Sequence, residues 1–134
     1  MTSFDEMLIE LRSFSKKYEF ELQPAKPYQI ENFKNRCLEN KVDKFAIDQL
    51  IDFYKIANGI SCVDSLELYA CDDIIIFEWW KDKVLWFGSR DYYTFTYFNS
   101  KFCVGDASNI SFSKEYEFDD LFSMIIKTLR IYED

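Results

Sequence analysis

Residues 50–88 read LIDFYKIANGISCVDSLELYACDDIIIFEWWKDKVLWFG, and their hydrophobic period changes partway along. Apolar side chains first recur at helical spacing, at Leu50, Ile51, Tyr54 and Ala57. Isoleucine and aromatic residues then dominate two short runs, 74–80 and 84–87, which is typical of strands. The stretch therefore predicts a helix that stops at Asn58-Gly59, where glycine allows a left-handed turn, and a sheet after it.

Two further helices are expected before this one. Ser3 and Glu6 stand three residues apart, as in a capping box, and apolar residues then recur at helical spacing to about Tyr18. Pro27 can open a second helix, because the first helical position needs no backbone N–H. The apolar face of that second helix is expected to contain Ile30, Phe33, Cys37 and Leu38.

Acidic residues mark the starts of the two remaining helices. Asp43 is a suitable N-cap for the helix that contains residues 47–57. Apolar residues recur at helical spacing from Phe118 to residue 129 and predict a final amphipathic helix. Asp119 and Asp120 then lie at its positively polarised end, which favours carboxylates.

Short strands are expected between the helices, at residues 66–69, 74–80, 84–87, 92–98 and 102–104. The polar turns between them leave no room for crossover helices, so the strands must pair antiparallel, with hairpin turns at 81–83, 88–91 and 99–101. The predicted fold class is α+β, with N-terminal helices and a C-terminal helix packed on a central antiparallel meander sheet. Because 134 residues make about one domain, residues 1–134 are expected to form a single domain.

Alternation along the strands predicts which side chains face the helices. In residues 92–98 it places Tyr93, Phe95 and Tyr97 together on the face toward the helices. Residues 74–80 are apolar on both faces, so that strand is expected to be central and covered on both sides. If part of its second face is open, Ile76 and Trp80 would form an exposed patch; the alternative is that both are core.

Composition predicts a soluble, cytoplasmic protein with reduced cysteines. The N-terminus lacks the basic and apolar regions of a leader, and no window reaches the roughly 18 apolar residues that a membrane span needs. The cysteines form no C-x-x-C pair, and a chain this long does not need disulfides for stability. We therefore expect free, mostly buried thiols at positions 37, 62, 71 and 103.

The sequence predicts neither an enzyme nor a cofactor or metal site. It contains no histidine, which is the commonest general base and metal ligand, and its three glycines are isolated, so no phosphate-binding loop can be built. Asp72 and Asp73 with Glu78 or Asp106 could make a carboxylate pair or a cation site, since side chains of neighbouring strands can converge. Ordinary strand-end and turn charges are the alternative interpretation.

Negative charge is concentrated in the second part of the chain. Residues 1–60 carry 9 basic and 10 acidic side chains, whereas residues 61–134 carry 7 basic and 14 acidic ones, for a net charge of −8. An acidic sheet repels nucleic acid, because that ligand is bound mainly by cations that neutralise phosphates, and it attracts a basic partner. A basic protein partner is therefore plausible; the alternative is that the charge only keeps an aromatic-rich domain in solution.

The order of these segments resembles the SUKH superfamily, which includes Smi/Knr-type cell-wall regulators and bacterial immunity proteins. The resemblance rests on FYKIANGI, LELY, IIIFEWW, the WFG that ends at Gly88, and FDDL at the last helix, and it covers about residues 45–125. Two features depart from the family pattern. The Gly-Asp pair that often follows the tryptophan strand of the family corresponds only loosely to residues 88–91. Phe45-Ala46-Ile47 stands where the family usually opens its Asn-Gly helix with Leu-Pro. The resemblance implies helices packed on an antiparallel sheet and a protein-binding role without catalysis.

The first hypothesis is therefore an immunity protein that binds and neutralises a cognate toxin, expected to be a basic nuclease domain, through an acidic surface. No direct contact with nucleic acid or membrane is expected. The domain is expected to be a monomer or a weak homodimer, and an exposed strand edge near Phe102 would invite pairing. The candidate partner-binding residues are Asp64, Glu67, Asp72, Asp73, Asp82, Asp91, Tyr92 and Asp106.

Two other hypotheses remain open. The second is an intracellular regulatory scaffold or adaptor of the Smi/Knr type, which would bind proteins of its own cell. The third is a carboxylate-based enzyme or small-ligand binder with an aromatic pocket around Trp79, Trp80 and Trp86.

Overall fold

The first helix begins one residue earlier than predicted. The computed structural model describes residues 1–106 and 116–131, and in it α1 spans Ser3–Lys17. The capping box is formed by Thr2 and Asp5: the Thr2 hydroxyl accepts from the Asp5 N–H at 3.1 Å, and Asp5 accepts from the Thr2 N–H at 3.3 Å. The predicted box of Ser3 and Glu6 is wrong because Thr2, with φ −79° and ψ 164°, holds the extended conformation of an N-cap.

Helix α2 spans Pro27–Glu39, with the proline in its first turn as predicted. Phe33 and Cys37 are buried, but Leu38 is 56% exposed, so the apolar stripe is narrower than expected. A cysteine and a leucine that are adjacent in a helix point about 100° apart, and only the cysteine faces the core.

Helix α3 spans Lys44–Tyr54 and ends four residues before Asn58-Gly59. Asp43 holds the N-cap position, but its carboxylate accepts a hydrogen bond from the Tyr97 hydroxyl at 2.5 Å instead of capping the helix. Asn58 Oδ1 accepts from the Cys71 N–H at 2.8 Å, and Gly59 has φ +86°. The Asn-Gly pair therefore joins the helix to the sheet and is not the helix stop that the sequence predicted.

The sheet is an antiparallel meander, as predicted, with its six strands in chain order. The strands are β1 (Ile60–Val63), β2 (Leu66–Leu68), β3 (Leu85–Arg90), β4 (Tyr93–Phe98), β5 (Lys101–Asp106) and β6 (Glu117–Phe118). The turn at Asn99 and Ser100 is confirmed, and both residues have positive φ, which suits a tight hairpin. The turn predicted at 88–91 is wrong in extent, because Gly88, Ser89 and Arg90 belong to β3.

The short strands β1 and β6 were not predicted, and β6 changes two expectations. Phe118 pairs with Phe102 and Glu117 with Cys103, so β6 covers the strand edge at these two residues of β5. The final helix, α4, therefore starts later, at Leu121–Leu129, where Asp120 accepts from the Ser123 N–H at 2.8 Å. Asp119 lies outside the helix and forms an ion pair with Lys101.

Residues 74–80 do not form the predicted strand. They fold into two 3₁₀ turns, η1 (Ile74–Phe77) and η2 (Trp80–Asp82), so residues 81–83 lead into β3 and are not a hairpin turn. Asp73 caps the first turn by accepting from the Ile75 N–H at 3.1 Å. Ile76 is 1% exposed and Trp80 is partly buried against the core, which agrees with the alternative that both are core and not with an exposed patch. Ile74, by contrast, is 79% exposed.

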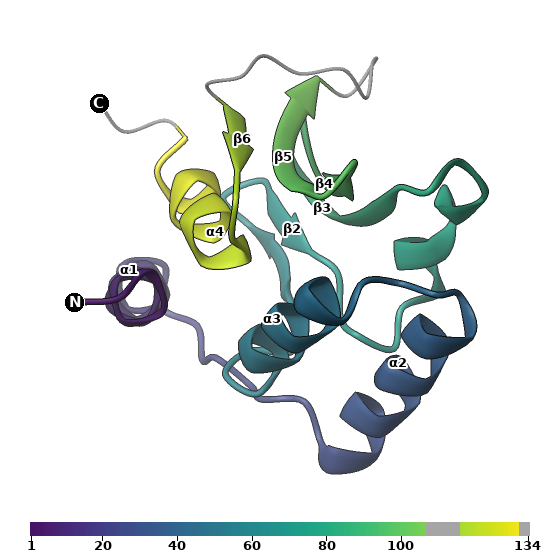
Figure 1. Ribbon diagram of the computed structural model, residues 1–134. Coiled ribbons are helices and arrows are strands. Elements are labelled where there is room, and N and C mark those ends of the chain that lie inside the picture. The colour runs from purple at the N-terminus through teal and green to yellow at the C-terminus, as the bar shows by residue number, and fades with distance from the viewer. Residues whose placement is uncertain (107–115, 132–134) are drawn as a thin grey trace.

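The helices gather on one side of the sheet, as Figure 1 shows. Helix α4 packs against β5 and β6, α1 lies along α4, and α2 lies beside α3. Phe95 and Tyr97 belong to the buried core and Tyr93 packs against it, which confirms the face predicted for this strand. The first and last helices meet directly, since the rings of Phe4 and Phe122 are 5.1 Å apart in an edge-to-face arrangement.

The buried side chain of Arg90 links β3 to the end of α4 and to the turn between β1 and β2. Arg90, at the end of β3, is 3% exposed, and its Nη1 donates to the carbonyls of Thr128 and Leu129 at 2.8 and 3.2 Å. Its Nη2 pairs with Asp64 Oδ2 at 2.5 Å, in the turn between β1 and β2. A cation is favourable at these carbonyls because the C-terminal end of a helix is negatively polarised.

The Asp64 carboxylate gives the fold an acid-sensitive contact. Its pKa is lowered by the Tyr18 hydroxyl, which donates to it at 2.9 Å, and by Arg90. A carboxyl with a lowered pKa in the folded state stabilises the fold above its unfolded pKa, about 3.9, and loses that contribution as the pH falls through the folded value.

We therefore expect the free energy of unfolding to fall less in the Asp64→Asn variant than in the wild type when the pH is lowered from about 4 to about 3. Urea unfolding at a series of pH values measures the difference. Asp52→Asn is the matched control, because Asp52 is an exposed carboxylate in α3. Parallel pH profiles for the wild type and Asp64→Asn would contradict the assignment.

Candidate functional site

The sequence-predicted site residues are divided between two ends of the sheet. Asp64 lies in the turn between β1 and β2, and Asp91 and Tyr92 form the turn between β3 and β4. The pairing of Leu66 with Arg90, of Arg90 with Tyr93, and of Tyr93 with Asp106 places all of these at one end. The side chain of Asp106 lies outside the described part of the chain. Asp64 is engaged by Arg90 and Tyr18, whereas Tyr92 is 81% exposed.

The other predicted acids lie toward the opposite end. Asp72, Asp73 and Asp82 belong to the segment between β2 and β3, where the chain has passed the pairing of Leu68 with Gly88. Asp72 accepts from Gln29 Nε2 at 3.1 Å. Reversing all predicted acids would therefore test two surfaces at once, and each surface needs its own variants.

An aromatic cluster lies beside this second group. The indoles of Trp79 and Trp86 are stacked, with centroids 4.1 Å apart and an interplanar angle of 4°. The Tyr69 ring meets Trp86 edge-on at 5.4 Å and 90°. All three side chains are partly exposed. Trp80 lies apart, with its indole N–H donating to the Asn40 carbonyl at 2.9 Å.

Because the two stacked indoles are in contact, they leave no gap for a ligand between them. Trp80 is also engaged elsewhere. In the third hypothesis, which stays a prediction, a ligand would have to lie beside the tryptophan pair and not between its rings.

Three carboxylates act on the Tyr69 hydroxyl, at the edge of the aromatic cluster. Burial raises the pKa of Tyr69 above its ordinary value, and Glu67, Asp73 and Glu78 raise it further, while the nearby Ser89 side chain lowers it. A tyrosine responds in this way only to charges that lie near its hydroxyl. We call the surface made by Tyr69, Trp79, Trp86, Glu67, Asp73 and Glu78 the acidic–aromatic surface.

Side chains from helices α2 and α3 anchor the segment that carries this surface. Arg36 Nη2 donates to the Cys71 carbonyl at 2.8 Å, and its guanidinium lies 5.1 Å from the centre of the Phe77 ring. The Tyr54 hydroxyl donates to the Tyr69 carbonyl at 3.0 Å. Such anchoring reduces the entropy that a binding surface loses when a partner docks.

Two of these six residues were predicted to bind a partner, and four were not. Glu67 and Tyr69 stand two apart on β2 and its continuation, so strand alternation could have placed Tyr69 beside Glu67. Glu78 and Trp79 could not be placed in this way, because the sequence suggested a strand where the chain forms 3₁₀ turns.

The described residues offer little for catalysis or metal binding. They contain no group of three or more Cys, Asp or Glu side chains positioned to hold a metal ion. Burial raises the pKa of Cys37 and Cys103 to about 12 and that of Cys71 to about 11, so these three thiols are protonated and poorly nucleophilic. The four cysteines are free, and Cys62 alone is exposed, which confirms the expectation of mostly buried thiols.

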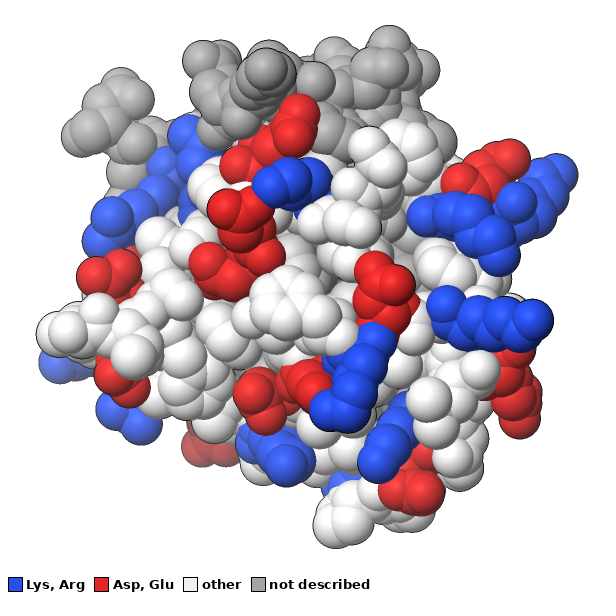
Figure 2. Space-filling view, viewed as in Figure 1, with Lys and Arg blue, Asp and Glu red and all other residues white. Residues whose placement is uncertain are grey.

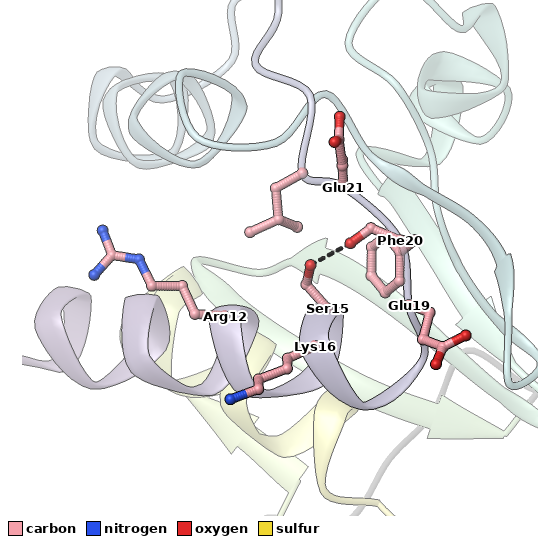
Figure 3. A pocket seen from close by; sticks show the side chains of 7 residues that line it. Arg12, Ser15, Lys16, Glu19, Phe20 and Glu21 are labelled. Carbon is pink, nitrogen blue, oxygen red and sulfur yellow. Dashed lines mark hydrogen bonds between the residues drawn. The ribbon is translucent and has the colours of Figure 1, made fainter.

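A shallow hollow of about 570 Å³ lies beside the end of α1. Figure 3 shows Arg12 and Lys16 on the helix, and Glu19 and Glu21 on the segment that follows it. The Ser15 hydroxyl donates to a backbone carbonyl, that of Phe20, so no base is arranged to activate it. Its mixed charges and open shape give this hollow no evident chemistry.

Charges of both signs are mixed over much of the surface. On the face seen in Figure 2, lysines and arginines lie among the acidic side chains and do not form a separate region. On this face the excess negative charge is therefore interspersed with positive charge. Within residues 1–106 and 116–131, none of the helices combines the length and the apolar character required to span a membrane.

The acidic–aromatic surface is the feature from which a function can be inferred. It combines aromatic rings with carboxylates that form no ion pair with the described lysines and arginines, a combination that suits the binding of a partner. No family model matches this sequence, and no curated protein matches it either.

Proposed function

We propose that this chain is an immunity-type protein that binds and neutralises a toxic protein, with the acidic–aromatic surface in contact with the toxin. The observation that carries the proposal is the partly exposed stack of Trp79 on Trp86, with Tyr69 at its edge, on a segment that also carries Asp73 and Glu78 and continues the strand of Glu67. Aromatic side chains are common anchors at protein interfaces, and complementary charge speeds the encounter of the two partners. The resemblance to the SUKH superfamily supports the same role.

The partner is expected to be a basic nuclease domain. A nuclease holds its substrate with cations that neutralise phosphates, so its substrate groove is positively charged. An acidic protein that covers this groove would exclude the nucleic acid without touching it. The proposed site of action is the cytoplasm, where the toxin would meet its substrate.

Co-expression with the product of the adjacent upstream gene tests the function. We expect the wild-type chain to restore growth and to co-purify with that product as a complex that salt weakens. Growth arrest that the chain fails to relieve would overturn the immunity proposal. An upstream gene without toxicity would also overturn it and would favour the regulatory adaptor of the Smi/Knr type.

The triple variant Glu67→Gln, Asp73→Asn and Glu78→Gln tests the surface. We expect association with the toxin to slow roughly tenfold and to depend less on salt, because the variant loses three negative charges at the interface. The amides keep the oxygen atoms that accept from the Cys62 and Ile75 N–H groups, so the fold should be retained. Stopped-flow association at several salt concentrations measures both effects.

The control variant is Glu6→Gln, Glu19→Gln and Asp52→Asn. It removes the same number of charges from exposed positions on or beside α1 and α3. If both triple variants slow association equally, net charge alone is responsible and the acidic–aromatic surface is not the contact.

A further inference from the structure

We infer that the acidic–aromatic surface binds an arginine side chain of the partner, with the guanidinium against the tryptophan pair and its charge facing the carboxylates. This inference depends on the proposed function in one respect only, namely that the natural partner is a basic protein. It adds the chemical group that the surface recognises and the residues that recognise it.

The carboxylates retain charge for a partner to neutralise. Glu67 Oε2 accepts from the Cys62 N–H at 2.9 Å and Asp73 Oδ1 accepts from the Ile75 N–H at 3.1 Å, so each uses one oxygen for the fold. In the described part of the chain, no lysine or arginine forms an ion pair with Glu67, Asp73 or Glu78. Their second oxygens can accept hydrogen bonds from an incoming cation.

The tryptophan pair offers an aromatic surface to that cation. Elsewhere in the molecule cations already lie over rings, with Arg36 5.1 Å from the centre of Phe77 and Lys83 5.1 Å from that of Trp80. Within the described residues, no cation lies over Trp79 or Trp86 in the same way. Tryptophan is the ring that attracts cations most strongly.

Arginine fits these two features better than a metal ion or lysine does. A metal ion needs several ligands at one point, and the described carboxylates are not grouped closely enough to supply them. A guanidinium is planar, so it can lie flat on an indole while its N–H groups reach carboxylates at its edge. Lysine carries a compact charge and lacks the flat surface.

Tryptophan indole signals in NMR spectra of the full chain test the inference. The probes are a tetra-arginine peptide, a tetra-lysine peptide and a tetra-citrulline peptide, which has the shape of arginine without its charge. The chain contains three tryptophans, so single Trp→Phe variants assign the three indole N–H signals. We expect the arginine peptide to shift the signals of Trp79 and Trp86, because the guanidinium would lie against their stacked rings, and to leave that of Trp80, which is not part of the pair. The indole N–H groups of Trp86 and Trp80 both donate to backbone carbonyls, so the difference reports ring contact.

The lysine peptide is expected to bind at least about threefold more weakly than the arginine peptide, and the citrulline peptide to cause no shift. In the variant Glu67→Gln, Asp73→Asn and Glu78→Gln, affinity for the arginine peptide should fall about tenfold, while the control Glu6→Gln, Glu19→Gln and Asp52→Asn should change it little. Equal binding of arginine and lysine peptides, equal shifts of all three indoles, or unchanged affinity in the first variant would each overturn the inference.

The peptide-binding test and the growth-rescue test can fail independently of each other, because peptide binding is measured without a toxin. Arginine binding without rescue of growth would leave the inference in place and remove the immunity role. Rescue of growth that survives the first triple variant, together with unchanged peptide affinity, would remove the inference and leave the immunity role.

Discussion

Replacing Gly88 with alanine is expected to destabilise the fold by about 3 kcal/mol or more, enough to remove much of the stability of a domain of this size. A Cβ at this position would lie 2.0 Å from the Glu67 carbonyl oxygen and 3.0 Å from the Leu68 Cα. Both atoms belong to the backbone of β2, so no side-chain rotation can relieve the contact. Strands β2 and β3 would have to separate where Leu68 pairs with Gly88.

The cause at Gly88 is close packing and not backbone conformation. Gly59 has a positive φ, whereas Gly88 does not; Gly88 lies in β3 directly against the backbone of β2 and beside a register shift in the pairing with β4. Urea unfolding followed by tryptophan fluorescence measures the loss. Ser89→Ala is the matched control, because it changes the next residue of the same strand and should cost less than about 1 kcal/mol. A Gly88→Ala protein as stable as the wild type would show that β2 and β3 are not packed as described.

Replacing Arg90 with methionine is expected to cost about 3 kcal/mol. The variant keeps the aliphatic bulk but removes every hydrogen bond from the guanidinium to the carbonyls of Thr128 and Leu129 and to Asp64. The end of α4 would lose its donors, and the turn that holds Asp64 would lose its cation. Because Asp64 is itself 45% exposed, it can be hydrated, so the cost should stay below that of a fully buried pair.

Arg130→Met is the control for that experiment. Arg130 forms an ion pair with Glu10, but its side chain is 52% exposed, and exposed pairs contribute at most about 1 kcal/mol. The free energy of unfolding in urea is the readout for both variants. Equal losses in the two proteins would mean that burial adds nothing to the Arg90 network.

The helices and the central strands could be predicted from the sequence, because their periods are long enough to recognise. The strand predicted at residues 74–80 shows where this fails. A short apolar run suits a strand, a buried turn of helix or a 3₁₀ turn equally well. The 3₁₀ turn at this place depends on a local hydrogen bond, from the Ile75 N–H to Asp73, and on which isoleucine is buried. Ile76 is buried in the core, whereas Ile74 is exposed.

The candidate site could be predicted only in part for the same reason. Its acidic character follows from the charge distribution, and Glu67 and Asp73 were among the predicted contacts. The stacking of Trp79 on Trp86 depends on how the 3₁₀ segment folds back over β3, which no periodicity reveals. Two-residue pairing such as that of β6 is also too short to leave a pattern in the sequence.

The contact between α1 and α4 has a consequence for protein synthesis. On a ribosome the first helix emerges long before the last one, so the part of α1 that packs against α4 stays uncovered until residues 121–129 have emerged. The meander can pair strand by strand as it emerges, but closure of the helical layer depends on contacts that are distant in the chain. We therefore expect nascent chains that stop before α4 to depend on chaperones until the final helix has left the exit tunnel.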